Sequence, residues 1–192
     1  MVIQRRKLHL ALALVALAAA IAPAGATTLV RMGLDDLVSM NESVIVGRVV
    51  DIHSRWNEGG TFILTDVRMA VDEVLKGGRG RNGDLTFTVM GGTVGDKTVL
   101  IVGGVELEYG SSYALFLSRE DLPGAPGVVT VRDHGQGAFT IVETPTATRA
   151  VSQASQHPLL ADWKGISEAP GGAEGIELNQ FIRQVRDLAR AR

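Results

Sequence analysis

The chain has 192 residues and no cysteine; 19 basic side chains stand against 21 acidic ones, for a formal net charge of −2. The lack of cysteine excludes disulfides, thiolate metal sites and thiol nucleophiles. The basic residues are scattered, so we expect none of the positive patches that collect nucleic-acid phosphates, and no nucleic-acid partner.

The N-terminus has the features of a cleavable signal peptide covering residues 1–26. Residues 5–7 are basic, and the apolar stretch over residues 8–22 is short for a membrane span, which needs about 20 residues. Ala24 and Ala26 form an A-x-A cleavage site, which predicts a mature chain that begins at Thr27. No cysteine follows the site for lipid attachment. We therefore expect a secreted or periplasmic protein without a stable membrane anchor.

Cleavage would leave 16 basic and 21 acidic side chains, a net charge of −5. A mature chain of this length is enough for one domain with its own core. Residues 34–38 have apolar positions at helical spacing, which predicts a short helix. From residue 43 the pattern changes to alternation, which is typical of strands. The alternating segments cover residues 43–56, 61–75, 85–90, 99–102, 113–117, 128–132 and 138–142.

Glycine-rich turns separate these segments, and little helix is predicted before residue 143. The fold class is therefore mainly β, a small barrel or sandwich. The two long first strands favour a β-barrel of five to seven strands over residues 27–143. We predict one face of the first strand to carry Val44, Val46, Val50 and Ile52.

The composition shifts after residue 143. Residues 144–175 contain several Pro, Ser, Thr and Gly, which indicates a linker with a short helix near residues 148–155. Residues 176–192 hold an amphipathic C-terminal helix with one apolar stripe, and basic residues load its last turns. Docking of this helix onto the domain and binding to a partner or a membrane both stay open.

Few residues suggest chemistry. The histidines left after cleavage, His53, His134 and His157, lack the spacing of a metal-binding helix, so we expect no metal, no cofactor and solvated strand-end histidines. No G-x-S-x-G motif occurs. Trp56, at a loop between two long strands, either contacts a partner or folds back to cap the barrel.

Several segments together resemble a group of uncharacterised exported bacterial proteins whose cores are similar to the OB-fold of the netrin-like module in tissue inhibitors of metalloproteinases. The segments are D-L-V at 36–38, V-I-V-G-R-V-V at 44–50, V-D-E-V-L-K-G at 71–77, Y-A-L-F-L at 113–117 and G-Q-G-A-F at 135–139. The resemblance implies an OB-like barrel with additions and no catalytic residues to carry over.

The resemblance also gives the processed N-terminus a role. In the inhibitors, the first residue of the mature chain chelates the protease zinc through its amino and carbonyl groups. Thr27 and Thr28 would occupy that place here, although no disulfide could hold them. We therefore expect a non-enzymatic binding or accessory domain with a protein partner, for which a secreted protease is one candidate. A secreted metalloprotease inhibitor and an unrecognised hydrolase using His53 and His134 are the alternatives.

Overall fold

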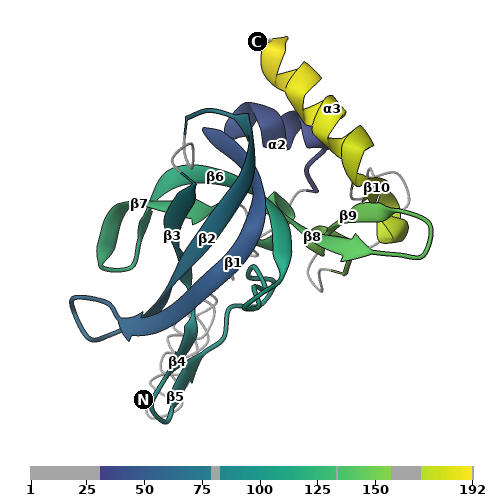
Figure 1. Ribbon diagram of the computed structural model, residues 1–192. Helices are drawn as coiled ribbons and strands as arrows, with labels where there is room; N and C mark the ends of the chain where they lie inside the picture. Colours follow the sequence, from purple (N-terminus) through teal and green to yellow (C-terminus); the bar gives the residue numbers. More distant parts are fainter. Residues whose placement is uncertain (1–30, 79–82, 133, 157–169, 192) are drawn as a thin grey trace, which may run out of the picture.

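The computed structural model describes residues 31–78, 83–132, 134–156 and 170–191 (Figure 1). The predictions on the signal peptide, on the cleavage residues Ala24 and Ala26, and on Thr27, Thr28 and His157 lie outside this range. The main helices are α2 (Leu34–Met40) and α3 (Leu178–Arg190). The strands are β1 (Ser43–Trp56), β2 (Ile63–Lys76), β3 (Asp84–Met90), β4 (Gly92–Val94), β5 (Lys97–Val99), β6 (Ser112–Leu122), β7 (Ala125–Val131), β8 (Ala138–Glu143), β9 (Thr148–Ser152) and β10 (Ile176–Glu177). Short 3-10 turns are η1 (His134–Gly137), η2 (Gln153–Gln156) and η3 (Gly172–Glu174).

Eight strands form one antiparallel sheet in the order β10-β9-β8-β6-β1-β2-β3, with β7 also paired to β6. β4 and β5 form a separate hairpin that projects from the body (Figure 1). The predicted mainly β class, with a short helix near the N-terminus and a C-terminal helix, is confirmed. The sheet does not close, because β3 pairs only with β2 in the described part of the chain. A barrel is therefore not confirmed, although β3 lies beside β7.

The β1–β2 hairpin is curved (Figure 1), and β3 at the edge of the sheet lies beside β7. The register between the two strands shifts at three places along β1, and such bulges increase twist. At Gly47 the strands approach closely: a Cβ atom there would lie 2.2 Å from the carbonyl oxygen of Ala70. Only glycine fits this approach, so the geometry of the bend depends on the glycine of the sequence V-I-V-G.

The central strands β1 and β6 are buried on both faces. On one face, Val44 and Phe116 pack with the two helices in a helix-side core. On the other face, Ile45, Val49 and Leu115 pack inside the curl of the sheet in a second core. The predicted single apolar face of β1 is therefore wrong beyond the bulges: Val50 is half-buried and Ile52 is 36% exposed.

Helix α3 docks on the sheet. Phe181 and Val185 are fully buried in the helix-side core, and the Phe181 ring lies 5.0 Å from that of Phe139, centroid to centroid. Glu177 caps the helix, because its carboxylate accepts the backbone N–H groups of Asn179 and Gln180. Of the two roles predicted for this segment, the structure shows docking.

Three other predictions differ from the structure. Within the predicted linker, residues 148–152 form β9 rather than a helix, paired with β8, with Ala150 fully buried. Residues 100–102 lie after β5 and belong to no strand. In the described part of residues 27–143, the strands number eight rather than five to seven. The local composition did not indicate β9, because this strand is buried only through its pairing with β8, on the other side of the turn at residues 144–147.

Candidate functional site

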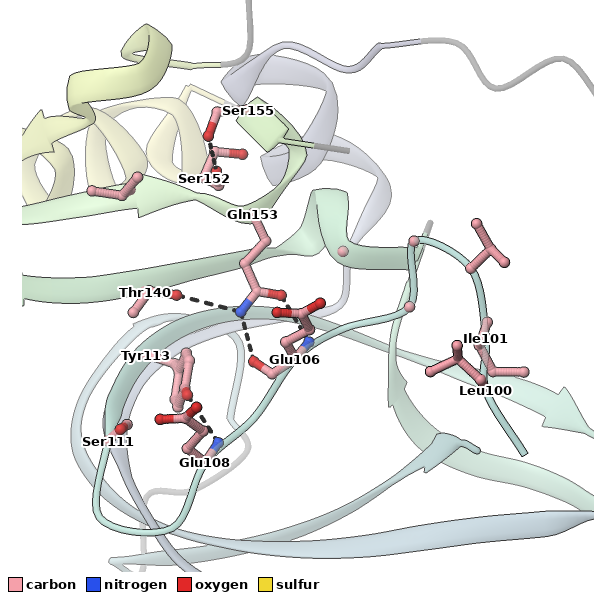
Figure 2. A pocket seen from close by; sticks show the side chains of 15 residues that line it. Leu100, Ile101, Glu106, Glu108, Ser111, Tyr113, Thr140, Ser152, Gln153 and Ser155 are labelled. Carbon is pink, nitrogen blue, oxygen red and sulfur yellow. Dashed lines mark hydrogen bonds between the residues drawn. The ribbon is translucent and has the colours of Figure 1, made fainter. Parts of the chain in front are cut away.

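The candidate site is a hollow of about 540 Å³ beside the segment that joins β5 to β6. One wall is this connecting segment, residues 100–111, which we call the crossing segment. The opposite wall comes from β8, β9 and η2 (Figure 2). The side chains discussed below that line the hollow, which we call the cleft, are Leu100, Val102, Glu106, Glu108, Tyr113 and Gln153.

Residues 105–108 of the crossing segment alternate between half-buried and exposed, although they form no paired strand. Val105 and Leu107 pack against the core inside the curl. Glu106 and Glu108 are exposed and line the cleft. The sequence V-E-L-E, which went unassigned in our sequence analysis, has the period of two that produces this alternation.

Side chains from distant parts of the chain fix the backbone of the crossing segment. The Gln153 amide accepts the N–H of Glu106 at 2.9 Å and donates to its carbonyl oxygen at 2.7 Å. The Tyr113 hydroxyl accepts the N–H of Glu108 at 2.9 Å. A third tie is the bond from the N–H of Gly135 to the carbonyl oxygen of Gly103, at 2.9 Å. These bonds replace the ladder that the segment lacks, so it is held at fixed positions.

The carboxylates of Glu106 and Glu108 make no hydrogen bond or ion pair with any described residue; only their backbone groups are bonded. Figure 2 shows both side chains on the cleft side of the segment. No His, Lys or Arg is among the described residues that line the cleft. The arrangement therefore offers negative charge at the cleft, which suits the binding of cationic groups.

Large apolar side chains stand exposed on the same segment. Leu100 is 83% exposed, Val102 is 56% exposed, and Tyr109, next to Glu108, is 76% exposed. Single exposed apolar residues are ordinary. Here three lie on one short segment, and two of them, Leu100 and Val102, line the cleft, which makes the segment a candidate contact surface. The prediction of a strand over residues 99–102 missed these exposed side chains.

The first described residues of the chain lie at the edge of the cleft. The N–H of Met32 donates to the side-chain oxygen of Gln136 at 3.0 Å, and Arg31 donates to the carbonyl oxygen of Ala154 at 3.2 Å. Ala154 belongs to η2, as does Gln153 of the cleft wall. Gln136 is buried in the G-Q-G-A-F segment. This part of the motif therefore anchors the N-terminal segment.

Trp56 lies elsewhere, at the last residue of β1 and in register with Ile63. It is 39% exposed and belongs to neither core. The prediction that it folds back as a cap on a barrel is thus unsupported. Its possible contact with a partner stays a prediction.

Among the described side chains, His53 is not brought together with acids into a reactive set; the side chain of His134 lies outside the described part. His53 faces Asp66 across the β1–β2 ladder, but Asp66 is engaged by Arg55 at 2.6 Å and by Thr88 at 2.7 Å. Partial burial acts to raise the pKa of Asp66, but the bonds from Arg55 and Thr88 outweigh it and hold the pKa below its usual range. Among the described residues, no group of three His, Asp or Glu could hold a metal ion. The hydrolase alternative gains no observation.

The V-D-E-V-L-K-G segment joins β2 to both helices. The Lys76 ammonium donates to the carbonyl oxygens of Val38 and Asn41 at the end of α2. Glu73 forms an ion pair with Arg186 of α3. The most specific piece of the resemblance therefore has a structural role here.

No helix in the part that the structure describes is long and apolar enough to span a membrane. Comparisons with protein-family models, with curated proteins and with solved structures find no match to this chain.

Proposed function

We propose that this protein is an exported, non-enzymatic binding domain that recognises a protein partner through the cleft and the crossing segment. One observation carries the proposal: Leu100, Val102 and Tyr109 are exposed together on a segment whose backbone is fixed by Gln153 and Tyr113. Ordering a loop in advance lowers the entropic cost of binding. An irregular segment held on a rigid sheet is the usual place for recognition.

Site-specific photocrosslinking tests the surface. A benzophenone amino acid replaces Tyr109, Trp56 or Val142, one position per variant, in cells that export the protein. Val142 is 39% exposed and lies outside the cleft, so it controls for non-specific capture. A discrete adduct from position 109 and none from position 142 supports recognition through the crossing segment. An adduct from position 56 alone assigns recognition to Trp56 and overturns this surface, and no adduct anywhere overturns the binding function.

Export belongs to the same proposal and rests on the signal-peptide features of residues 1–26. Intact-mass measurement of the protein from the extracytoplasmic fraction is expected to give a chain that starts at Thr27. A cytoplasmic protein that retains Met1 would overturn export without bearing on the cleft.

The resemblance to the OB-fold is also part of the proposal, and the strand order supports it. Five strands follow the order β3-β2-β1-β6-β7, with β3 beside β7. This strand order supports the proposal of a five-stranded barrel that stays partly open. An experimental structure in which β3 is hydrogen-bonded to β7 would support the barrel. A different strand order would reject it.

A second candidate, the secreted metalloprotease inhibitor, is favoured by the position of Arg31 and Met32. Their bonds to Ala154 and Gln136 fix the first described residues beside η2 and η1, four and five positions after Thr27 in the sequence. A protease that received the Thr27 amine could then also meet the crossing segment. Secreted zinc proteases assayed with micromolar mature protein test this. A form with one extra residue before Thr27 is the control, because it moves the amine; equal activity with and without the protein rejects the inhibitor.

A further inference from the structure

From the hydrogen-bonding groups that line the cleft, we infer that it binds an amino sugar, a polyhydroxylated ring that carries an ammonium group. The inference goes beyond the proposed protein partner, because that partner is assigned to the exposed apolar side chains of the crossing segment. The hollow of about 540 Å³ is within the size range of small-molecule sites, about 300–1,000 Å³.

Three neighbouring strands form the floor of the cleft. Tyr113 of β6 lies opposite Thr140 of β8, and Thr140 lies opposite Val151 of β9. All three residues line the cleft, and directly opposite residues of an antiparallel sheet present their side chains on the same face. Figure 2 shows the Tyr113 and Thr140 side chains pointing toward the crossing segment. The floor therefore carries two neighbouring side chains that end in hydroxyl groups.

Both hydroxyl groups of the floor keep a hydrogen atom to donate. Tyr113 is only 3% exposed, and its oxygen accepts the N–H of Glu108. The Thr140 oxygen accepts a bond from the Gln153 amide at 3.4 Å. Neither O–H group donates to a described residue. Because a buried hydroxyl donor needs an acceptor, an oxygen atom of a ligand fits above this floor.

The crossing segment supplies the opposite chemistry, which is acceptors with negative charge. The carboxylates of Glu106 and Glu108 lie on the cleft side and are two residues apart in the sequence (Figure 2). Like charges repel each other, so an ammonium group placed beside both carboxylates is favourable. Ionised carboxylates also accept hydrogen bonds from hydroxyl groups.

Only a ligand with both kinds of group uses the whole cleft. An anion would meet the two carboxylates, and no Lys, Arg or His of the described part lines the cleft. A polyamine would leave the hydroxyl donors of the floor without acceptors. A peptide could not add a strand here, because side chains already occupy the backbone N–H and carbonyl groups of Glu106 and the N–H of Glu108. An amino sugar brings hydroxyl oxygens for the floor, an ammonium group for the carboxylates and C–H groups for Val151.

Three ligands separate these contributions in NMR titrations of the exported chain at mildly acidic pH, where sugar amines are protonated. The chitosan trimer has hydroxyl and ammonium groups, the chitin trimer is its uncharged N-acetylated form, and spermidine has as many ammonium groups but no hydroxyl. We expect the chitosan trimer to shift the Glu108 and Thr140 amide signals saturably, and both other ligands to bind at least tenfold more weakly. Equal affinity for either reference ligand, or no saturable binding of the chitosan trimer, would overturn the inference.

A pair of carboxylate variants tests the charged wall. The double variant Glu106→Gln/Glu108→Gln should bind the chitosan trimer at least tenfold more weakly and should no longer prefer it to the chitin trimer. The double variant Glu58→Gln/Glu143→Gln removes two exposed carboxylates that do not line the cleft and should change neither property. Equal weakening by the two pairs would mean attraction to net charge alone and would overturn the inference.

A pair of hydroxyl variants tests the floor. The double variant Tyr113→Phe/Thr140→Val should remove the preference for the chitosan trimer over spermidine. The control Tyr109→Phe/Thr86→Val removes the same kinds of hydroxyl from exposed positions outside the cleft and should keep that preference. Thermal unfolding checks that each variant is folded, and the carboxylate variants decide if the floor variant is not. An unchanged preference in the folded floor variant overturns the inference, whereas an adduct from position 109 would still support the protein partner.

Discussion

Gln153 holds Glu106 by both of its backbone groups, across 47 positions of sequence. The side-chain amide takes the place that a neighbouring strand would take, accepting the N–H and donating to the carbonyl oxygen. The crossing segment is thereby fixed without being part of a sheet.

Replacing Gln153 by Ala should free the middle of the crossing segment. Two neutral hydrogen bonds at a half-exposed site contribute about 1–2 kcal/mol together, and the loss should be local. We expect the Glu106 amide to lose its protection against hydrogen exchange while the Glu108 amide keeps its own. Tyr113→Phe is the matched control, because it removes only the bond to Glu108. Unchanged exchange at Glu106 in Gln153→Ala would contradict the role assigned to the amide.

Helix α3 should be inseparable from the stability of the domain. Phe181 is fully buried between the rings of Phe116 and Phe139. Truncation of a buried Phe costs about 3–5 kcal/mol, so Phe181→Ala should lower the free energy of unfolding by about that amount in urea titration. Gln184→Ala, on the exposed side of the same helix, should change it by less than about 0.5 kcal/mol. If both variants changed the free energy of unfolding by the same small amount, the helix would have to be undocked in solution.

Period and spacing were enough to predict the elements that carry their own pattern. The helix of residues 34–40, the amphipathic α3 and most strands of the sheet were placed from alternation or helical spacing alone. The mainly β class followed from their number. The two-sided burial of β1 could not be predicted, since the bulges near Gly47 exchange its faces and both faces are covered.

The cleft could not be predicted from the sequence for a different reason. Its walls come from residues 100–111 and from β8, β9 and η2, and a long-range bond such as Gln153 to Glu106 leaves no local signal. The V-E-L-E alternation was present in the sequence, but an extended segment that pairs with no other strand cannot be told from a loop by its sequence pattern. The motifs that stood out, in contrast, hold the fold together through Lys76, Glu73 and Gln136.

Low pH should remove the contribution of the ionised Asp66 side chain to the stability of the folded protein. The pKa of this carboxyl is lowered in the folded protein from its ordinary 3.8, so its stabilising effect is full above the unfolded pKa and is lost as the pH falls through the folded one. We expect Asp66→Asn to cost about 1–2 kcal/mol near pH 7 and progressively less below pH about 4. Urea titrations at several pH values measure this difference.

Asp96→Asn is the control for that experiment, because the Asp96 side chain is 89% exposed. It should follow the wild type at every pH. A cost of Asp66→Asn that stayed constant down to low pH would assign the effect to lost shape or packing rather than to the charge paired with Arg55.

Gly77, which follows β2, should tolerate substitution less well than Gly60. Positive φ opposes substitution at both positions, and steric crowding opposes it at Gly77 only. Both have positive φ, +78° and +63°. A non-glycine residue in this region costs about 1–2 kcal/mol, so Gly60→Ala, with open space around it, should show that cost alone. At Gly77 a Cβ atom would also lie 2.4 Å from the carbonyl oxygen of Glu42. Backbone must then move where Lys76 ties β2 to α2. We therefore expect Gly77→Ala to lower the free energy of unfolding by at least about 1 kcal/mol more than Gly60→Ala, as measured by urea titration. Equal costs would show that the β2–α2 junction yields without strain.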